Sequence, residues 1–148
     1  MIEVSIDTVQ VLNGLNRLSN VDSAINFELI AAKSRQNIID RTGLGKDVNN
    51  NDFAPYSAAY LREKSLTHDD ITVNLQYSNS MLGSISFDSD NNSALVFFLD
   101  RENSEKAKKH NLGEGGLPKR EFFGLSTDDK EEIQAMMFDD INRYLSQI

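Results

Sequence analysis

The segment Gly113-Glu-Gly-Gly-Leu-Pro-Lys-Arg-Glu-Phe-Phe-Gly-Leu-Ser126 separates a mixed helical and extended region from a strongly periodic C-terminal helix. Three glycines and one proline in its first half exclude a regular helix or strand there. Two basic residues, Lys119 and Arg120, then precede the adjacent aromatic residues Phe122 and Phe123. An arm of this kind suits attachment to a surface, since it contains no nucleophile with a neighbouring general base. Whether it docks on its own domain or on a neighbouring chain is left open by the sequence.

The residues that follow the arm predict the final helix. Ser126 and, three positions later, Asp129 form a capping-box pattern, although Glu or Gln is more usual at the second position. Asp128 and Asp129 in the first turn also suit the positive end of the helix dipole. Apolar residues recur at three- and four-residue spacing, namely Ile133, Met137, Ile141, Tyr144, Leu145 and Ile148. The pattern indicates a long amphipathic helix.

The N-terminal residues predict one short strand and two helices. Apolar and polar side chains alternate over Ile2–Ile6, which is typical of a strand with one solvated face. A first helix is expected from a cap near Asp7 to about Asn20. A longer one is expected from about Val21 to Arg41, ended by Gly43. Its apolar stripe comprises Val21, Ile25, Leu29, Ala32 and Ile39, widened by Ala24, Ile30, Ala31 and Ile38.

The middle of the chain predicts a turn, a short helix and a strand. Phe53–Tyr56 contains a proline and apolar side chains that we expect to pack inward. Ser57 can then cap a short helix. Ile71–Tyr77 alternates apolar and polar residues more regularly than any other segment, so it predicts a strand. Ser78–Gly83 is expected to form a turn or a single helical turn.

A β-hairpin and a charged helix are expected next. The hairpin has strands beginning at Ile85 and Ala94, joined by the polar turn Asp88–Ser93. Leu95–Leu99 is apolar on both faces, which predicts a central or doubly covered strand. Glu102–Asn111 reads as a short charged helix.

These elements together predict an α+β fold in one domain spanning residues 1–148. The expected architecture is an antiparallel sheet of three to four strands, with the N-terminal helices and the long C-terminal helix packed on one face. A chain of 148 residues is long enough for one substantial core.

The composition excludes several classes of protein. The hydrophobic fraction of 39% and the charged fraction of 26% are ordinary for a soluble domain. No apolar run reaches the roughly 20 residues that cross a bilayer, and no leader is recognisable, so we expect synthesis in the cytoplasm and no membrane partner. The absence of cysteine excludes disulfides and thiolate catalysis.

The charge is unevenly distributed along the chain. The formal net charge of −8 argues against general nucleic-acid binding. The segment from Arg101 to Arg120 nevertheless has six basic and three acidic residues, a net charge of +3. The segment from Ser126 to Ile148 has six acidic and two basic residues, a net charge of −4. Such neighbouring segments fit a subunit that meets copies of itself or a charged partner, or equally the solvated faces of a monomer.

Several short motifs resemble known ligand-binding motifs but lack the flanking elements or residues that those motifs require. Thr42–Lys46 resembles a phosphate loop, but a helix precedes it and Asp47 follows the lysine. Asp47–Asn51 and Asp88–Asn92 match the start of a calcium loop but lack its central glycine and terminal glutamate. The remaining candidates are isolated histidines and one carboxylate pair, namely His68, His110 and Asp69-Asp70. The sequence therefore predicts no enzyme, and no catalytic, cofactor-binding or metal-binding residue.

Two stretches carry a family resemblance. The first comprises Ile39-Asp-Arg-Thr-Gly43, Asp47, Asp52-Phe-Ala-Pro-Tyr-Ser57, Tyr60 and Lys64. The second comprises His110-Asn-Leu-Gly113 and Leu117-Pro-Lys-Arg-Glu-Phe-Phe-Gly-Leu-Ser126, with Asn79-Ser-Met-Leu-Gly-Ser-Ile85 between the two. In order and spacing they resemble the virion morphogenesis proteins of tailed phages and prophages, which include tail completion, neck and head–tail joining proteins. The chain departs from that pattern at Ala107-Lys-Lys109 and in the short Glu-Gly-Gly after Gly113.

The resemblance implies a non-enzymatic structural protein of the virion, acting as a ring subunit, with a hexamer expected. The expected partners are copies of itself and the adjoining head–tail connector, tail terminator or tail-tube proteins. The residues expected at the interface are Lys119, Arg120, Phe122, Phe123, Lys106 and Lys109. Within this set, we expect the two phenylalanines to fix the arm to the fold, and Lys119 and Arg120 to reach a neighbour.

Other functions stay open at this stage. The basic residues could instead face DNA in the lumen of the ring, which the overall negative charge disfavours. The chain could be the tail terminator itself. A small prophage-encoded enzyme or inhibitor is the alternative from another class.

Overall fold

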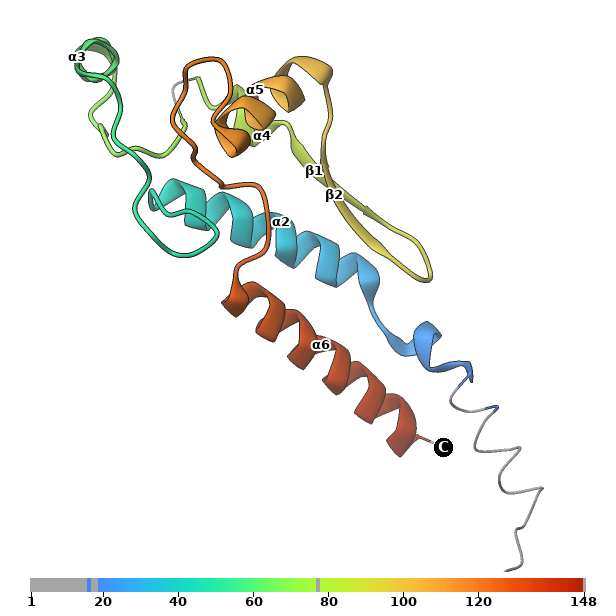
Figure 1. Cartoon of the computed structure of the whole chain (residues 1–148). Helices are drawn as coiled ribbons and strands as arrows, with labels where there is room; N and C mark the ends of the chain where they lie inside the picture. The colour runs from blue at the N-terminus through green and yellow to red at the C-terminus, as the bar shows by residue number, and fades with distance from the viewer. Residues whose placement is uncertain (1–15, 17–18, 77, 148) are drawn as a thin grey trace, which may run out of the picture.

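The computed structural model describes residues 16, 19–76 and 78–147, and it has an α+β fold (Figure 1). The described elements are, in order, η1 (Val21–Ala24), α2 (Phe27–Gly43), α3 (Ala58–Thr67), α4 (Ser80–Gly83), β1 (Ile85–Ser89), β2 (Ala94–Phe98), α5 (Arg101–Leu112) and α6 (Thr127–Ser146). The strand expected at Ile2–Ile6 and most of the helix expected up to Asn20 lie outside the described residues. The described helices include none that is long and apolar enough to cross a membrane.

Helix α2 is the central element of the fold. The β1–β2 hairpin packs along it, and α6 runs beside it on another side (Figure 1). Helices α4 and α5 gather at the end of the hairpin where β1 begins and β2 ends. Helix α3 projects beyond the end of α2 that carries Gly43 (Figure 1).

Helix α2 begins six residues later than the sequence predicts. Ile25 is extended, and the Asn26 side chain accepts a hydrogen bond from the backbone N–H of Leu29 at 3.0 Å. This cap starts a new helix and leaves Val21–Ala24 as a separate 3-10 turn. The buried face matches the widened part of the expected stripe at Ile30, Ala31 and Ile38, whereas Leu29 is 55% exposed. The buried residues of α2 are Ile30, Ala31, Ser34, Ile38, Arg41 and Thr42.

The strand predicted at Ile71–Tyr77 is not formed over its described part, residues 71–76. Side chains of other segments form hydrogen bonds with backbone N–H and carbonyl groups of this segment. In a sheet, these groups would bond to a neighbouring strand. The Tyr56 hydroxyl accepts a hydrogen bond from the Leu75 N–H at 2.9 Å, and Lys64 Nζ donates to the Thr72 carbonyl at 3.0 Å. Leu75 also adopts a left-handed backbone, with φ of 59°. These contacts bend the segment although its side-chain alternation favours a strand.

The predicted hairpin is present, but its second strand is not doubly covered. Strands β1 and β2 pair antiparallel, and in the described part of the chain they form a two-stranded sheet. Phe98 and Val96 pack against the core, whereas Leu95 is 57% exposed and Leu99 is 69% exposed. Among the described residues, β2 therefore has one strand neighbour and is covered on its face toward α2, so neither the central position nor the double coverage is found there.

One core joins α2, the hairpin, α4, α5 and the arm. Its buried residues are Ile38, Phe53, Leu75, Met81, Leu82, Ile85, Ala107 and Phe122. Phe53 is 6% exposed, which confirms that the proline-containing turn packs inward. The expected cap of α3 is also present, since Ser57 Oγ accepts a hydrogen bond from the Tyr60 N–H at 3.2 Å.

Helix α6 begins as predicted but is only lightly buried. Ser126 and Asp129 form a complete capping box, with both reciprocal hydrogen bonds present. Over its whole length Asp129 is the sole residue of α6 that is buried. The expected apolar stripe is half-buried at Ile133, Met137, Ile141 and Tyr144, while Leu145 is 42% exposed and Ile148 lies outside the described residues.

Candidate functional site

The arm after α5 is closed at its base by backbone and side-chain hydrogen bonds. The N–H of Arg120 donates to the carbonyl of His110 at 2.7 Å, so residues 111–119 form a loop whose two ends meet. Asn111 Oδ1 accepts from the N–H groups of both Phe122 and Phe123 at 2.9 Å. Gly113 ends α5 with φ of 71°, and a Cβ there would lie 2.9 Å from the Lys119 nitrogen. Glycine therefore permits both the turn and the close return of the chain.

The end of the arm docks on its own domain. Phe122 is fully buried in the core. Phe123 is half-buried and packs on Phe98, with ring centroids 4.8 Å apart. Phe122 is thus the more deeply buried of the two, and Phe123 packs against the edge of the same core. The Val48 N–H also donates to the Glu121 carbonyl at 2.9 Å, which joins the arm to the loop after α2.

Arg120 is buried rather than exposed to a neighbour. Its side chain is 3% exposed, and it donates from Nε to the Ala54 carbonyl and from Nη2 to the Pro55 carbonyl, both at 2.8 Å. Its guanidinium carbon lies 5.1 Å from the centre of the Tyr56 ring. Arg120 therefore fixes the turn before α3 to the arm.

A second cation lies near the same ring. Lys64 Nζ is 5.3 Å from the centre of the Tyr56 ring, and it donates to Asn74 Oδ1 at 3.0 Å. Among the described residues, neither Lys64 nor Arg120 has a carboxylate within ion-pair distance. Burial lowers the pKa of both cations and raises the pKa of the Tyr56 phenol. Cation–π contacts and backbone carbonyls therefore take the place of ion pairs here.

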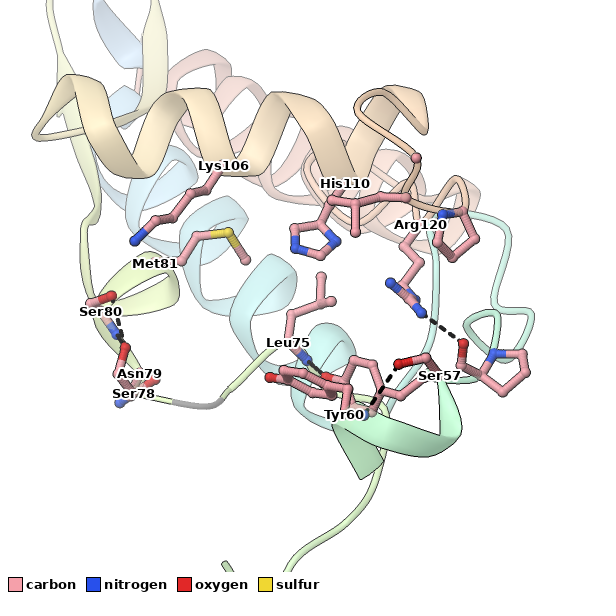
Figure 2. A pocket seen from close by; sticks show the side chains of 15 residues that line it. Ser57, Tyr60, Leu75, Ser78, Asn79, Ser80, Met81, Lys106, His110 and Arg120 are labelled. Carbon is pink, nitrogen blue, oxygen red and sulfur yellow. Dashed lines mark hydrogen bonds between the residues drawn. The ribbon is translucent and has the colours of Figure 1, made fainter. Parts of the chain in front are cut away.

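A cavity of about 590 Å³ opens beside these residues (Figure 2). Lys106 and His110 enter it from α5, Tyr60 from α3, and Leu75 and Met81 from the core side (Figure 2). Leu117 and Pro118 of the arm and Arg120 complete the lining. Apolar groups form most of the lining, and the described lining includes two cationic side chains, Lys106 and Arg120, but no Asp or Glu. The cavity thus suits an apolar group accompanied by negative charge.

His110 has an unusual environment in this cavity. Its Nδ1 atom is buried and has no hydrogen-bond partner among the described residues. Burial lowers the pKa of His110, and the nearby Arg120 charge lowers it further. The imidazole is therefore held in its neutral form in the folded protein.

This environment predicts a pH dependence of stability. The unfolded chain protonates His110 near its ordinary pKa of 6.5, so it binds more protons than the folded protein at and below that pH. We expect the free energy of unfolding to fall as the pH drops through that value toward the lowered pKa. In the His110→Gln variant this decrease should be smaller.

Urea unfolding between about pH 8 and about pH 5 measures the effect, as the slope of stability against pH in this range reports bound protons. At about pH 8 both proteins carry a neutral side chain at position 110. The difference between their free energies of unfolding at that pH therefore reports the change in packing alone. Equal slopes for the wild type and the variant would contradict the prediction.

The cavity offers binding groups rather than a catalytic pair. Ser57 Oγ is used as a helix cap, and Ser80 and Ser78 hydroxyls bond to each other at 3.0 Å. Within the described residues of the chain, no three His, Asp or Glu side chains gather as metal ligands. The Asp47 loop is instead held by its own side chain, because Oδ1 accepts from the N–H groups of Asn49 and Asn51. Its resemblance to a calcium loop therefore reflects a local turn.

The structure separates the six residues predicted at the interface. Phe122 and Arg120 are buried and Phe123 is half-buried, so these three stabilise the fold. The side chains that stay exposed are Lys106, Lys109 and Lys119. Lys106 pairs with Glu102 at 2.9 Å and Lys119 with Glu121 at 3.2 Å, both in solvent.

Sequence reasoning missed the contribution of Tyr56, Tyr60 and His110 to the cavity. The two tyrosines were interpreted as core residues and the histidine as an isolated surface or supporting residue. One signal was present, since Tyr60 and Lys64 stand one helical turn apart on a helix capped by Ser57.

Comparisons with models of protein families, with curated proteins and with solved structures found no match.

Proposed function

We propose that this protein is a structural subunit of a phage or prophage virion that acts in tail completion or head–tail joining as part of a ring. The observation that carries the proposal is the contact between the two stretches that resemble the virion morphogenesis family. Arg41 of the first stretch donates to the carbonyls of Phe122 and Gly124 in the second, at 3.1 and 2.7 Å. Arg120 of the second donates in turn to the carbonyls of Ala54 and Pro55 in the first.

These reciprocal bonds give the resemblance a physical basis. The two stretches are separated by the hairpin and α5, yet each supplies an arginine that binds backbone carbonyls of the other. The residues of the two stretches therefore stabilise one another in the fold.

The surface supports assembly rather than catalysis. Large apolar side chains are exposed on several described elements, namely Leu44, Leu66, Leu95, Leu99, Leu112 and Phe138. Exposed apolar groups of this size are common singly, but they favour contact with other protein surfaces when they lie beside complementary charge.

The experiment that tests this function is a measurement of assembly. Sedimentation equilibrium of the purified chain should show a mass that rises with concentration to one discrete oligomer, and negative-stain electron microscopy should show closed rings, with six subunits expected. Purified virions carrying the gene should contain the protein. A chain that remains monomeric at concentrations near about 1 mM, where even weak association is visible, would contradict the proposal.

The interface cannot be tested by substituting the residues at the base of the arm. Arg120→Ala together with Phe122→Ala removes two buried groups, so loss of assembly would report unfolding. The alternative of a small prophage enzyme or inhibitor needs a separate test. A ring of subunits whose cavities hold no tightly bound ligand would exclude it. Native mass spectrometry of the same sample separates these outcomes.

A further inference from the structure

Helix α6 carries a second stripe on the face opposite its packed one. Glu131, Ala135, Phe138, Asn142 and Leu145 are exposed and follow one another at four- and three-residue spacing, so they share one face. We call this set the α6 outer stripe. Phe138 at its centre is 63% exposed. A large aromatic side chain in that position favours contact with another surface.

The α6 outer stripe is acidic as well as apolar. Asp128 and Asp139 flank it on the same side of the helix as Glu131. None of these three carboxylates forms an ion pair or a hydrogen bond with another described residue. The stripe therefore presents one phenylalanine surrounded by uncompensated negative charge.

The cavity described above has the opposite character. Its inner wall is apolar, with Leu75, Met81 and Leu117, and its volume of about 590 Å³ exceeds that of one phenylalanine side chain. Lys106 lies at its edge, and Lys109 is exposed on the same helix. No Asp or Glu belongs to the described lining. An aromatic side chain flanked by carboxylates would therefore suit this cavity. Its ring would contact the apolar wall, and the carboxylates would face the lysine at the edge.

The two surfaces belong to different sides of one subunit. In Figure 1, α6 and α5 lie on opposite sides of α2, so the α6 outer stripe cannot reach the cavity of its own chain. The segments that carry these surfaces have net charges of −4 and +3. A contact between them must therefore join two copies, and it leaves a free stripe at one end and a free cavity at the other. Such a contact closes into a ring or continues as a filament.

We propose that the α6 outer stripe of one subunit binds the cavity of the next, with Phe138 entering between Leu75, Met81 and Leu117. Glu131 and Asp139 then face Lys106 and Lys109 across the contact. This inference rests on the proposed ring function, and it names the surfaces that would build the ring. Helices that place spaced anchors into a complementary groove are a common mode of recognition.

The first test removes the aromatic anchor. Phe138→Ser should raise the dissociation constant of the oligomer at least about tenfold, since central aromatic residues dominate interface affinity. The matched control is Leu66→Ser on α3, which changes an apolar side chain that is 82% exposed and belongs neither to the α6 outer stripe nor to the cavity lining. It should leave the dissociation constant unchanged.

The second test exchanges the charges. One variant carries Lys106→Glu and Lys109→Glu, and another carries Glu131→Lys and Asp139→Lys. Each variant alone should lose assembly, because like charges then meet at every contact. An equimolar mixture should assemble again, since subunits can alternate with opposite charges at each junction. Arg101→Glu on α5, at a side chain that is 94% exposed, controls for a charge reversal on the same helix outside the cavity lining.

The outcomes separate the two proposals. A wild-type oligomer that is insensitive to Phe138→Ser and to the charge variants would overturn this inference and leave the ring function standing. Variants that lose assembly but do not recover on mixing would also overturn it. A wild type that never assembles would overturn both. Thermal unfolding of each variant should match the wild type, because all seven substituted side chains are exposed.

Discussion

Replacing Phe122 by alanine is expected to lower the free energy of unfolding by about 3–5 kcal/mol, the usual cost of deleting a buried aromatic side chain. Phe122 has no exposed surface and lies in the core with Leu82 and Ile85. Its ring is also in contact with the ring of Phe123, at a centroid separation of 6.3 Å. Alanine leaves a cavity that the neighbouring elements cannot collapse to fill, because Arg120 and Asn111 fix the backbone on both sides.

Urea unfolding followed by circular dichroism measures this loss. The matched control is Phe138→Ala, which removes the same ring from a side chain that is 63% exposed. That variant should change the stability of the monomer by no more than about 0.5 kcal/mol. Similar effects at the two positions would show that the arm is not anchored through Phe122.

Replacing Arg41 by methionine is expected to lower the free energy of unfolding by about 3–5 kcal/mol, as is typical when one partner of a buried ion pair is removed. Arg41 and Asp129 form an ion pair in which their side chains are 9% and 10% exposed. Arg41 also donates to two carbonyls of the arm. Methionine of similar length would leave those carbonyls without a donor and Asp129 without its counter-charge.

The exposed pair of Lys33 and Glu132 provides the control for this second prediction. It joins the same two helices at 3.4 Å, with side chains 43% and 42% exposed. Lys33→Met should therefore cost at most about 1 kcal/mol, as expected of a solvated pair. The ratio of the two losses, measured by chemical unfolding, tests whether α6 is held on α2 mainly through the buried pair at Asp129. Equal losses would contradict that view.

Elements that depend on local signals were predictable from the sequence. The capping box at Ser126, the Ser57 cap, the hairpin turn and the charged helix before Gly113 all depend on residues within a few positions of one another. Capping side chains and turn residues act through hydrogen bonds within one turn of chain. Their patterns therefore hold in almost any tertiary setting.

Features that depend on distant residues were not predictable in the same way. The alternation of Ile71–Gln76 predicts a strand, but Tyr56 and Lys64 bind its backbone from outside the segment. The apolar run of β2 suggests two covered faces, yet among the described residues no element covers the second face, where Leu95 is exposed. In both cases the tertiary contacts, rather than the local preference, decide the conformation.

The candidate site shows the same division. The sequence singled out the arm and its arginine, and the structure places Arg120 beside the cavity. The sequence could not show that Arg120 binds the carbonyls of Ala54 and Pro55, or that the half-buried His110 lies near it, because these contacts join separate segments. A basic residue beside two aromatics fits an exposed anchor and a buried clamp equally well.

The closed base of the arm bears on how this protein could diversify. The hydrogen bond between His110 and Arg120 and the bonds from Asn111 fix both ends of the loop independently of the residues between them. Lengthening such a loop adds only a small entropic cost, about 0.6 kcal/mol for each doubling. Insertions among Glu114–Pro118 would therefore leave the core intact while reshaping one wall of the cavity. Natural variation at this position could change which partner is recognised without a new fold having to arise.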